Sequence, residues 1–425
     1  MTGLLSRRGL LLRLQRLIET AEPEGQVTGL LVVHLRRLDR VTHAYGAAAV
    51  NELRRDIGER LSAGLGPQEL LAHPDDRTFS VVSPVAGGPG PGADGWLTVR
   101  ARDLIASLRA EPFAIGGDVF EPDIGVGVSR APDDSGYAHE LMVMADEAAA
   151  RSSQQRSNRI AWPDHQAMAA KRQRLSLEAG LRRAVSEGLF SVYYQPIVDL
   201  RAGARVVGAE ALARWPQPEG QAAIGPEVFI PLAEELDLMD SIGRYVFESS
   251  CQQLRRWQDQ PGGGDFWVSV NLAPAQLQDP ELASRFAEIA HAAGVSPSNI
   301  KLEITESAFE DGFEVAGRVI DELAAAGFPL ALDDFGTGHS SLNRLINMPF
   351  TLLKVDRSFV WQSPDGAGAA VVSSLSQLAG SLKLASLGEG VETPAHDAYL
   401  RQCGYAYAQG YLYGRPVPAA ELAID

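Results

Sequence analysis

Residues 330–342 read LALDDFGTGHSSL, and the character of the second half of the chain follows from this stretch. An apolar run, LAL, ends in two adjacent carboxylates, Asp333 and Asp334, and then in a glycine-rich loop. The apolar run is typical of a buried strand. Adjacent acids at its end repel each other, and burial adds a desolvation cost. We therefore expect something cationic at this point of the fold.

The stretch is one of eight short β-rich runs in the second half. They are SVYYQPIVDL (191–200), ARVVGAEALARW (204–215), DFWVSVNL (265–272), IKLEITES (300–307), PLALDDFG (329–336), LLKVDRSFV (352–360), KLASLGEG (383–390) and YAQGYLYG (407–414). Segments with helical apolar spacing, such as residues 226–257, separate most of them. This alternation predicts a (βα)8 TIM-like barrel, and the chain as a whole is expected to be α/β.

Polar residues gather near the ends of these predicted strands. They are Glu210, Asn271, Glu303, Asp333, Asp334, Lys354, Asp356 and Glu389. Each alone is more often a surface charge or a helix cap, but active sites of such barrels lie at the carboxyl ends of the strands, so their coincidence indicates a site. Oxygen ligands favour Mg²⁺ or Mn²⁺ over zinc. Two such ions ~3.5–4 Å apart, held by Asp333 and Asp334, would suit phosphoryl displacement.

Composition limits the alternatives. The 425 residues are enough for two domains, and a net charge of −16 argues against a broad surface for DNA or RNA. Cys251 and Cys403 lie far apart, and no apolar run could span a bilayer, so we expect a cytoplasmic protein without membrane insertion. The N-terminal MTGLLSRRGLLLRLQRL superficially resembles a signal peptide. Arg13 and Arg16 interrupt its apolar patch at helical spacing, which favours an amphipathic helix.

The first half is expected to form a smaller α/β domain over residues 1–165, followed by a linker helix at 166–178 and the barrel domain at 179–425. Its elements are predicted as a strand at 30–35, a helix at 47–65, a hairpin through 69–84, a helix at 97–110, a strand pair through 113–130 and a last helix at 139–153. No comparable cluster of acids follows its strands.

The second half resembles an EAL-domain cyclic di-GMP phosphodiesterase over roughly residues 173–425. The stretches that carry the resemblance are, in chain order, YYQPIVDL, GAEALARW, SVNLAPAQL, LEITES, LALDDFGTGHSSL, LKVDRSFV, GEGVET and QGYLYGRP. So many stretches in the right order make the match specific. The resemblance implies hydrolysis of cyclic di-GMP to linear pGpG by a two-metal mechanism with Mg²⁺ or Mn²⁺, and a homodimer formed through the EAL domain.

The resemblance also implies a role for each site residue. Glu210, Asn271, Glu303 and Asp333 match ligands of a first metal ion, and Asp333 with Asp334 match those of a second. Lys354 matches the lysine that holds the attacking water, Glu389 matches a glutamate near that water, and Asp334 completes the catalytic set. Gln195, Arg214 and Gln409 match substrate contacts, while Glu306, Asp356 and Glu392 match supporting residues, with Glu306 steadying the DDFGTG loop.

Three positions depart from this pattern, and none removes a metal ligand. His339 replaces the usual Tyr after the loop, Gly388 replaces an Ala, and Ala406 stands where an Asp is common. A looser DDFGTG loop could lower the activity.

The first half resembles a GGDEF (diguanylate cyclase) domain in degenerate form. The signature reads Asp75-Asp76-Arg77-Thr78-Phe79, without the two glycines and with Arg77 and Thr78 in place of the two acids. The metal-aspartate positions fall on His34 and Arg36, the guanine positions on Thr42 and Asn51, and the inhibitory RxxD site on Gly66 and Glu69. The resemblance therefore implies a domain that makes no cyclic di-GMP and that could instead regulate the barrel or contact a protein partner.

Two other classes of function compete with an enzyme. A non-catalytic cyclic di-GMP receptor usually loses a ligand or a loop acid, and a protein-interaction module needs no metal clamp, so the intact acidic set argues against both. The dipeptide His396-Asp397 is also found in histidine–aspartate phosphohydrolases, but no partner histidines stand at useful spacing.

Overall fold

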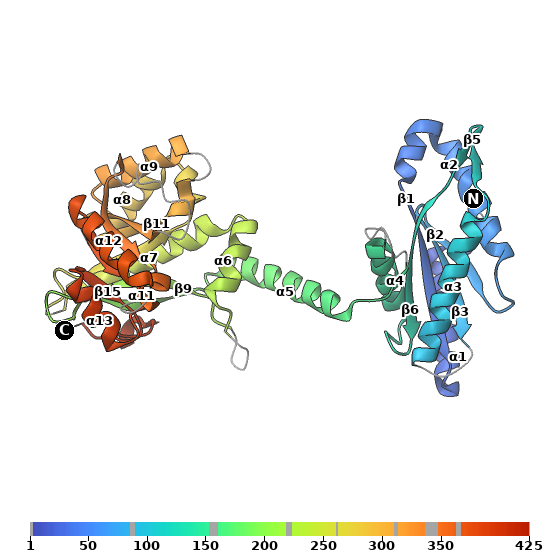
Figure 1. Ribbon diagram of the computed structural model, residues 1–425, viewed down its shortest axis with the longest axis horizontal. Helices are drawn as coiled ribbons and strands as arrows, with labels where there is room; N and C mark the ends of the chain where they lie inside the picture. Colours follow the sequence, from blue (N-terminus) through green and yellow to red (C-terminus); the bar gives the residue numbers. More distant parts are fainter. Residues whose placement is uncertain are drawn as a thin grey trace. The chain divides into compact units, whose positions relative to one another are not determined.

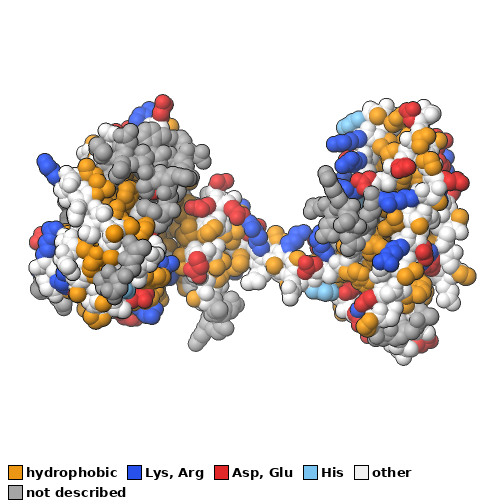
Figure 2. Space-filling model, viewed as in Figure 1, with side chains coloured by type: hydrophobic (Ala, Val, Ile, Leu, Met, Phe, Trp, Pro, Cys, Tyr) orange, Lys and Arg blue, Asp and Glu red, His pale blue; other side chains and the backbone are white. Residues whose placement is uncertain are grey.

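The computed structural model describes residues 3–85, 90–152, 160–217, 223–260, 262–309, 313–335, 347–362 and 367–424. The chain divides into two compact units, Met1–Arg172 and Gln173–Asp425, and the division falls within helix α5 (His165–Glu187) (Figure 1). Figure 2 shows charged side chains of both signs along α5. The helix contains the ion pairs Arg174–Glu178 and Arg183–Glu187. In the described part of the chain, every helix is too short or too polar to span a bilayer.

The first unit is a five-stranded sheet with helices on both faces. The strand order is β2 (Leu70–Asp75), β3 (Thr78–Val85), β1 (Val27–Arg36), β6 (Asp123–Ala131) and β7 (Ile160–Ala161). Helices α2 (Leu38–Ala63) and α3 (Pro91–Arg109) share one apolar core with the sheet, and α1 (Arg7–Ala21) and α4 (Ala138–Ser152) share another. Alternating β1 residues serve the two cores, as expected for a strand covered on both faces.

These elements confirm the predicted α/β pattern of the first half, with one difference. The predicted strand pair through 113–130 is a separate two-stranded hairpin, β4 (Phe113–Ile115) and β5 (Asp118–Phe120), followed by β6 in the main sheet. The N-terminal amphipathic helix is confirmed as α1, which buries Leu10, Leu14 and Ile18 at intervals of four residues.

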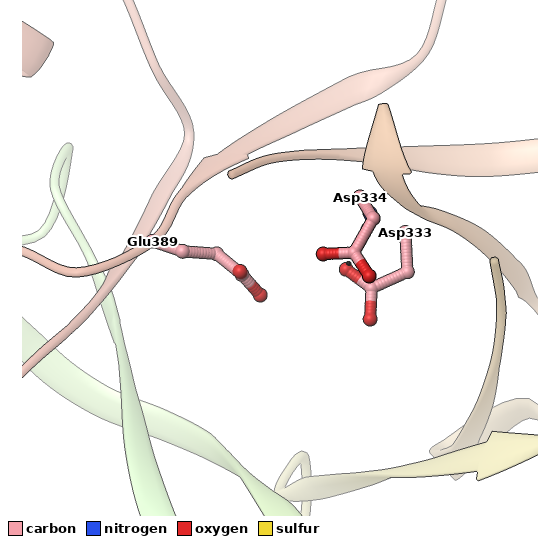
Figure 3. A group of neighbouring side chains, drawn as sticks. All are labelled: Asp333, Asp334 and Glu389. Atoms are coloured by element: carbon pink, nitrogen blue, oxygen red, sulfur yellow. Dashed lines mark hydrogen bonds between the residues drawn. The ribbon is translucent and has the colours of Figure 1, made fainter. Parts of the chain in front are cut away.

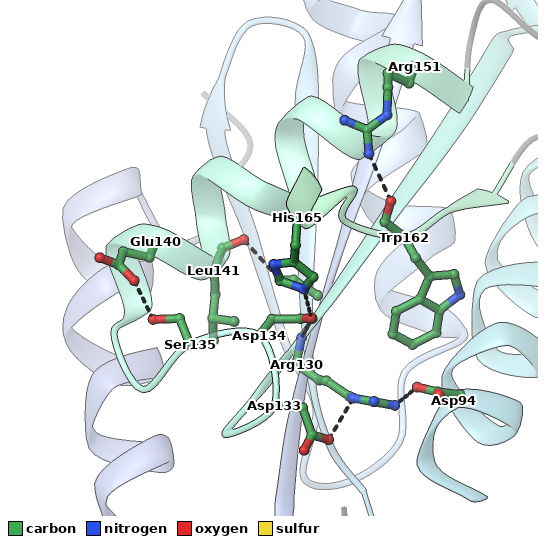
Figure 4. A network of polar contacts seen from close by, with 11 residues as sticks. Asp94, Arg130, Asp133, Asp134, Ser135, Glu140, Leu141, Arg151, Trp162 and His165 are labelled. Atoms are coloured by element: carbon green, nitrogen blue, oxygen red, sulfur yellow. Dashed lines mark hydrogen bonds and ion pairs between the residues drawn. The ribbon is translucent and has the colours of Figure 1, made fainter. Parts of the chain in front are cut away.

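A polar network ties the end of β6 to the start of α5 (Figure 4). Arg130 pairs with Asp94 of α3 and, at 2.8 Å from its Nε, with Asp133. Oδ2 of Asp134 accepts a hydrogen bond from the Arg130 backbone N–H at 2.8 Å, while Oδ1 lies 2.9 Å from Nε2 of His165. Asp134 therefore fixes the first residue of α5 to the loop that follows β6.

The second unit is a barrel of eight strands. They are β8 (Ser191–Asp199), β9 (Arg205–Arg214), β10 (Trp267–Leu272), β11 (Ile300–Thr305), β12 (Leu330–Phe335), β13 (Phe350–Val355), β14 (Ala385–Gly388) and β15 (Tyr407–Gln409). Pairing of β15 with β8 closes the barrel, and the short β16 (Val417–Pro418) adds to β8 outside the ring. The predicted fold class, α/β with a TIM-like barrel, is thus confirmed.

The barrel departs from a regular (βα)8 pattern at its first strand. β8 runs antiparallel to both neighbours, β9 and β15, whereas β9 to β15 are parallel. The chain passes from β8 to β9 through a tight connection at residues 200–204, so no crossover helix is needed there. The predicted strand at 352–360 also ends earlier, because residues 357–361 form helix α11 (Arg357–Trp361).

Helices cover the outside of the ring. They are α6 (Pro226–Glu235), α7 (Met239–Gln258), α8 (Leu282–Ala292), α9 (Phe313–Ala325), α11, α12 (Ala367–Ser381) and α13 (Pro394–Gln402). Leu302 and Ile304 of β11 belong to the large core shared with these helices, so the alternate residues Lys301 and Glu303 point into the barrel. The interior therefore receives side chains in layers, and the topmost layer carries the polar residues.

Lys301 lies low in this interior and has no carboxylate partner among the described residues. Its Nζ lies 4.3 Å from the ring centroid of Trp267, which belongs to the apolar cluster inside the barrel. Burial lowers the pKa of Lys301 to about 8. A lysine whose pKa is lower in the folded protein destabilises the fold while it is charged, and stability rises with pH between about 8 and the unfolded value of about 10.5.

We predict that Lys301→Met stabilises the protein. The lowered pKa corresponds to a destabilisation of about 3 kcal/mol by the charged lysine, which the substitution removes. Loss of the cation–π contact costs about 1–2 kcal/mol, so the free energy of unfolding should rise by about 1–2 kcal/mol at pH 7. Urea unfolding of the full chain measures this, and the variant should lose the gain in stability that wild type shows above pH 8. Lys171→Met, at an exposed lysine of α5, is the control and should change little. A destabilised Lys301→Met would contradict the prediction.

Candidate active site

Glu210 is the centre of a hydrogen-bonded group on four strands. Asn271 Nδ2 donates to its Oε1 at 2.7 Å, and Gln409 Nε2 donates to its Oε2 at 2.7 Å. Gln409 Nε2 also donates to Oε1 of Gln195 at 3.0 Å, and Gln195 Nε2 donates to the Gly414 carbonyl at 3.2 Å. Glu210 comes from β9, Asn271 from β10, Gln409 from β15 and Gln195 from β8. These residues were predicted in two groups, metal ligands and substrate contacts, and they form one continuous network.

Lys354 of β13 is the buried cation of the barrel rim. It is 1% exposed, and its Nζ lies 2.7 Å from Glu303 Oε2, 2.7 Å from Glu389 Oε1 and 3.1 Å from Asp333 Oδ1. The three carboxylates come from β11, from the residue after β14 and from β12. Lys354 is thus the basic group that meets Asp333, the first of the two acids that follow the apolar run LAL.

Asp333 and Asp334 lie opposite Glu389 across the mouth of the barrel (Figure 3). One oxygen of each of the three carboxylates lies within 4.8 Å of the other two. Asp334 has a φ of 54°, a left-handed conformation that is uncommon for a residue with a Cβ, and its backbone N–H donates to Asp333 Oδ1 at 3.0 Å. Because of this turn both carboxylates are presented to the same space, although successive residues of a regular strand would face opposite sides.

Neighbouring charges and hydrogen bonds perturb the pKa values of Lys354 and Glu210. Burial alone would lower the pKa of the ammonium, but Asp333, Glu210 and the other acids raise it well above 10.5. Burial would raise the pKa of Glu210, but Lys354 and the donated hydrogen bonds of Gln409 and Asn271 lower it. Lys354 is therefore charged and Glu210 ionised at neutral pH.

Other acids of the group hold their protons more tightly. Burial raises the pKa of Glu389 to about 8, with Lys354 acting against the increase. Burial also raises the pKa of Glu303 well above its usual range and that of Asp334 above its ordinary value, and Asp333 adds to both effects. The single positive charge of Lys354 does not compensate the negative charges of this many neighbouring carboxylates.

The donor set fits divalent cations. Glu210, Glu303, Asp333, Asp334 and Glu389, when ionised, leave a formal charge of −4 around Lys354, which two divalent cations would balance. Oε1 of Glu303 is buried and receives no hydrogen bond within the described residues, so a strong acceptor is unsatisfied at this point. The oxygen-only set is the one preferred by Mg²⁺ and Mn²⁺.

A cavity of ≈ 450 Å³ opens over these residues. It is lined by Gln195, Glu210, Asp334, Asp356, Arg357, Trp361, Glu389, Gly390, Glu392, Gln409, Gly410 and Tyr411. Five of these, Arg357, Trp361, Gly390, Gly410 and Tyr411, were not among the site residues predicted from the sequence. An adjoining cavity of ≈ 370 Å³ is mainly apolar and contains Arg214 and Asn271.

The remaining predicted residues lie around this rim. Arg214 stands beside Tyr193, 5.4 Å from its ring centroid, in the apolar cavity and not over the acids. Oδ1 of Asp356 accepts the Ser358 backbone N–H at 2.9 Å, so it caps α11 as well as lining the main cavity. Glu392 is an exposed wall residue, and Glu306 begins the short turn after β11. His339 and the rest of the DDFGTG loop after Phe335 lie outside the described residues.

Gly388 is explained by packing at the end of β14. A Cβ at this position would lie 2.5 Å from Cδ1 of Leu400 on α13. The glycine therefore lets α13 approach the strand that precedes Glu389.

In the first unit, residues 75–79 lie at the turn of the β2–β3 hairpin. Asp75 Oδ2 accepts from Thr78 Oγ1 and Oδ1 from the Arg77 backbone N–H, both at 2.8 Å, so this carboxylate holds the turn. Arg77 Nη2 contacts both carboxylate oxygens of Asp39 at 3.0 Å. A cavity beside the turn is lined by basic side chains and one acid, Asp39.

Comparison with known proteins agrees with this architecture. Residues 178–416 match the EAL domain family, and residues 1–159 match the family described as diguanylate cyclase, GGDEF domain. The chain is 32% identical over 425 residues to an uncharacterized signaling protein of Caulobacter vibrioides, covering 51% of that protein. It is 31% identical over 411 residues to the bifunctional diguanylate cyclase/cyclic di-GMP phosphodiesterase MucR of Pseudomonas aeruginosa, covering 96% of this chain and 58% of MucR.

The barrel also has solved relatives. The MucR phosphodiesterase structure in complex with cyclic di-GMP is 36% identical, with a TM-score of 0.55, and covers 58% of this chain and 100% of that one. The chain thus spans between half and three-fifths of the two curated relatives named above. It belongs to the EAL-domain family, and its EAL domain is preceded by a domain of the GGDEF family.

Proposed function

We propose that the barrel domain is a phosphodiesterase that hydrolyses cyclic di-GMP to linear pGpG. The observation that carries this proposal is the cluster at the barrel mouth, where Lys354 contacts three carboxylates supplied by different strands. The family membership and the likeness to a phosphodiesterase solved with cyclic di-GMP support the choice of substrate.

Divalent cations complete the proposed site. Glu210, Asn271, Glu303 and Asp333 would hold one Mg²⁺ or Mn²⁺, and Asp333 with Asp334 would hold a second. When bound, such ions supply a water of lowered pKa and neutralise negative charge on the phosphoryl oxygens. In the structure Asn271 points its amide N–H at Glu210, so its side chain must turn to offer its oxygen.

The chain's own residues orient the substrate and the water. Lys354, fixed by its three ion pairs, would hold the attacking water with an ammonium proton. Glu389, whose pKa is raised to about 8 by burial, is suited to exchange a proton with that water near neutral pH. Gln195 and Gln409 line the same cavity and would position the nucleotide, and Arg214 would do so from the adjoining cavity.

Product analysis tests the proposal. The full chain is incubated with cyclic di-GMP and either Mg²⁺ or Mn²⁺, and the products are separated by chromatography. We expect pGpG to accumulate, and excess chelator to stop its formation. Binding of cyclic di-GMP without cleavage in both metals would favour a receptor instead.

The GGDEF domain is proposed to be catalytically inactive. By the resemblance, His34 and Arg36 occupy the positions of the metal-binding aspartates of a cyclase. Arg36 pairs with Asp123 at 3.1 Å, and Arg77 stands where the signature has an acid. Arg36 and Arg77 would repel the Mg²⁺ that triphosphate condensation requires.

We predict that the purified chain makes no cyclic di-GMP from GTP and Mg²⁺. Because the barrel would consume any product, the assay is run with the Asp333→Asn variant and scored for both cyclic di-GMP and pGpG. A protein-free reaction gives the baseline, and either product above it would refute the proposed inactivity.

We also retain as proposals the assembly, the cellular location and the domain limits expected from the sequence. A homodimer through the EAL domain, a protein partner of the GGDEF domain, a cytoplasmic location and the boundaries 1–165, 166–178 and 179–425 remain predictions from the sequence. Both cysteines are free thiols in the structure, in keeping with a reducing compartment.

A further inference from the structure

The main cavity has aromatic side chains on its wall in addition to the acids. Trp361 is 47% exposed and Tyr411 is 50% exposed, and both line the cavity that contains Glu210, Asp334 and Glu389. The other tryptophans of this domain, Trp215, Trp257 and Trp267, are between 2% and 6% exposed. An indole that contributed only to the core would be buried like these three.

Trp361 is placed by the strand that carries Lys354. β13 ends at Val355, Asp356 caps α11, and Trp361 is the last residue of that helix. Its Nε1–H donates to the carbonyl of Gly390 at 2.9 Å, which fixes the ring against the residue that follows Glu389. Gly390 has a φ of 66°, and a Cβ there would lie 2.3 Å from Cβ of Arg357, so the contact between α11 and this loop is close.

Each exposed ring of the cavity is accompanied by an arginine. The guanidinium carbon of Arg357 lies 5.1 Å from the ring centroid of Trp361, and that of Arg415 lies 4.0 Å from the ring centroid of Tyr411. Aromatic rings and guanidinium planes are the surfaces on which proteins stack unpaired nucleobases. The wall therefore has the chemistry to bind a base close to an acidic centre suited to a phosphodiester.

We propose that Trp361 is a specificity-determining residue on which one guanine base of cyclic di-GMP stacks while a phosphodiester lies at the acidic cluster. The inference rests on the proposed function and adds to it a base-binding surface. It predicts that Trp361 contributes to ground-state and transition-state binding alike, so that its loss acts mainly on KM.

Substitution of Trp361 tests the proposal. Stacking of one base corresponds to about a 5- to 100-fold change in affinity, so Trp361→Ala should raise KM for cyclic di-GMP by that factor. Trp361→Phe keeps an aromatic ring but cannot donate to Gly390, and its KM should stay within about threefold of wild type. The kcat/KM for bis(4-nitrophenyl) phosphate, a phosphodiester without a purine, is measured in parallel. Trp361→Ala should lower kcat/KM for cyclic di-GMP more than kcat/KM for this control substrate.

A binding measurement provides a second readout. Wild type and variants are titrated with cyclic di-GMP in excess chelator while tryptophan fluorescence is recorded. Quenching should occur in wild type and disappear in Trp361→Phe. Trp96, an exposed tryptophan of the GGDEF domain, supplies the control, because Trp96→Phe should retain the quenching.

The outcomes separate this inference from the proposed function. A wild-type KM in Trp361→Ala would overturn the stacking role. If Trp361→Phe were as impaired as Trp361→Ala, or if both substrates lost kcat/KM equally, the side chain would position the Gly390 loop instead. Binding of cyclic di-GMP without cleavage would refute the proposed phosphodiesterase activity. The dissociation constants of the Trp361 variants would then still test the stacking role. Absence of both binding and cleavage would refute both proposals.

Discussion

Asp333→Asn should lower the turnover of cyclic di-GMP by about three orders of magnitude or more. Asp333 is 7% exposed, contacts Lys354 at 3.1 Å, and is the residue proposed to serve both cation positions. The amide keeps the size of the side chain but removes its charge and one acceptor oxygen. The loss should therefore appear in kcat, with a weakened response to Mn²⁺ in a calorimetric titration.

The fold should survive this substitution. Burial and the carboxylate of Asp333 raise the pKa of Asp334, so removing the charge of Asp333 relieves repulsion near Asp334. Asp259→Asn is the matched control, since Asp259 ends α7 and pairs with Arg255 at 2.7 Å on the surface. The control should turn over at the wild-type rate. Ordinary turnover by Asp333→Asn, or activity in excess chelator, would show that this rim is not a metal-dependent site.

The barrel could be predicted from the sequence because its strands are short apolar runs that end in polar residues at regular spacing. Glu303, Asp333 and Lys354 stand in separate runs, and a closed ring of parallel strands brings the ends of those runs together. The antiparallel direction of β8 could not be recognised, because its residues do not specify a direction and the direction depends on the connection at 200–204.

The central position of Lys354 and the role of Trp361 required the structure. In the sequence Lys354 is a single basic residue inside an apolar run, and nothing there shows that three carboxylates from other strands surround it. Trp361 follows the DRSFV segment, which the sequence predicts as the end of a strand. In the structure Asp356 instead caps helix α11, and Trp361 ends that helix. One signal could have indicated the helix, since Asp is among the residues preferred at a helix N-cap.

Lys354→Met should impair the protein in two ways, in stability and in turnover. The substitution keeps the length of the side chain but leaves Glu303, Glu389 and Asp333 without their shared cation in a buried site. Removing one partner of a buried ion pair costs about 3–5 kcal/mol, so the metal-free variant should be less stable than wild type by up to that amount. Loss of the donor that holds the water should also lower kcat by about two to three orders of magnitude.

The pH dependence of the stability loss follows from the shifted pKa values. The pKa of Lys354 is raised above the unfolded value of about 10.5, so its stabilising effect is present at all lower pH values at which its partners are ionised. Without the ammonium group of Lys354, the neighbouring carboxylates retain protons to higher pH in the folded state. The stability of the variant therefore falls relative to wild type as pH rises. Urea unfolding in chelator should therefore give a larger difference at pH 8 than at pH 5.

Two lysines of one barrel should thus respond to the same substitution with opposite signs. Lys301 is half-buried and has no acidic partner among the described residues, so Lys301→Met stabilises. Lys354 is buried among acids, so Lys354→Met destabilises. Lys383→Met, at an exposed lysine of the same domain, is the neutral reference. Divalent cations should restore much of the stability of Lys354→Met but little of its kcat, because cations can replace the charge of the ammonium but not its hydrogen bond to the water. A variant with wild-type kcat would show that Lys354 serves only to balance charge.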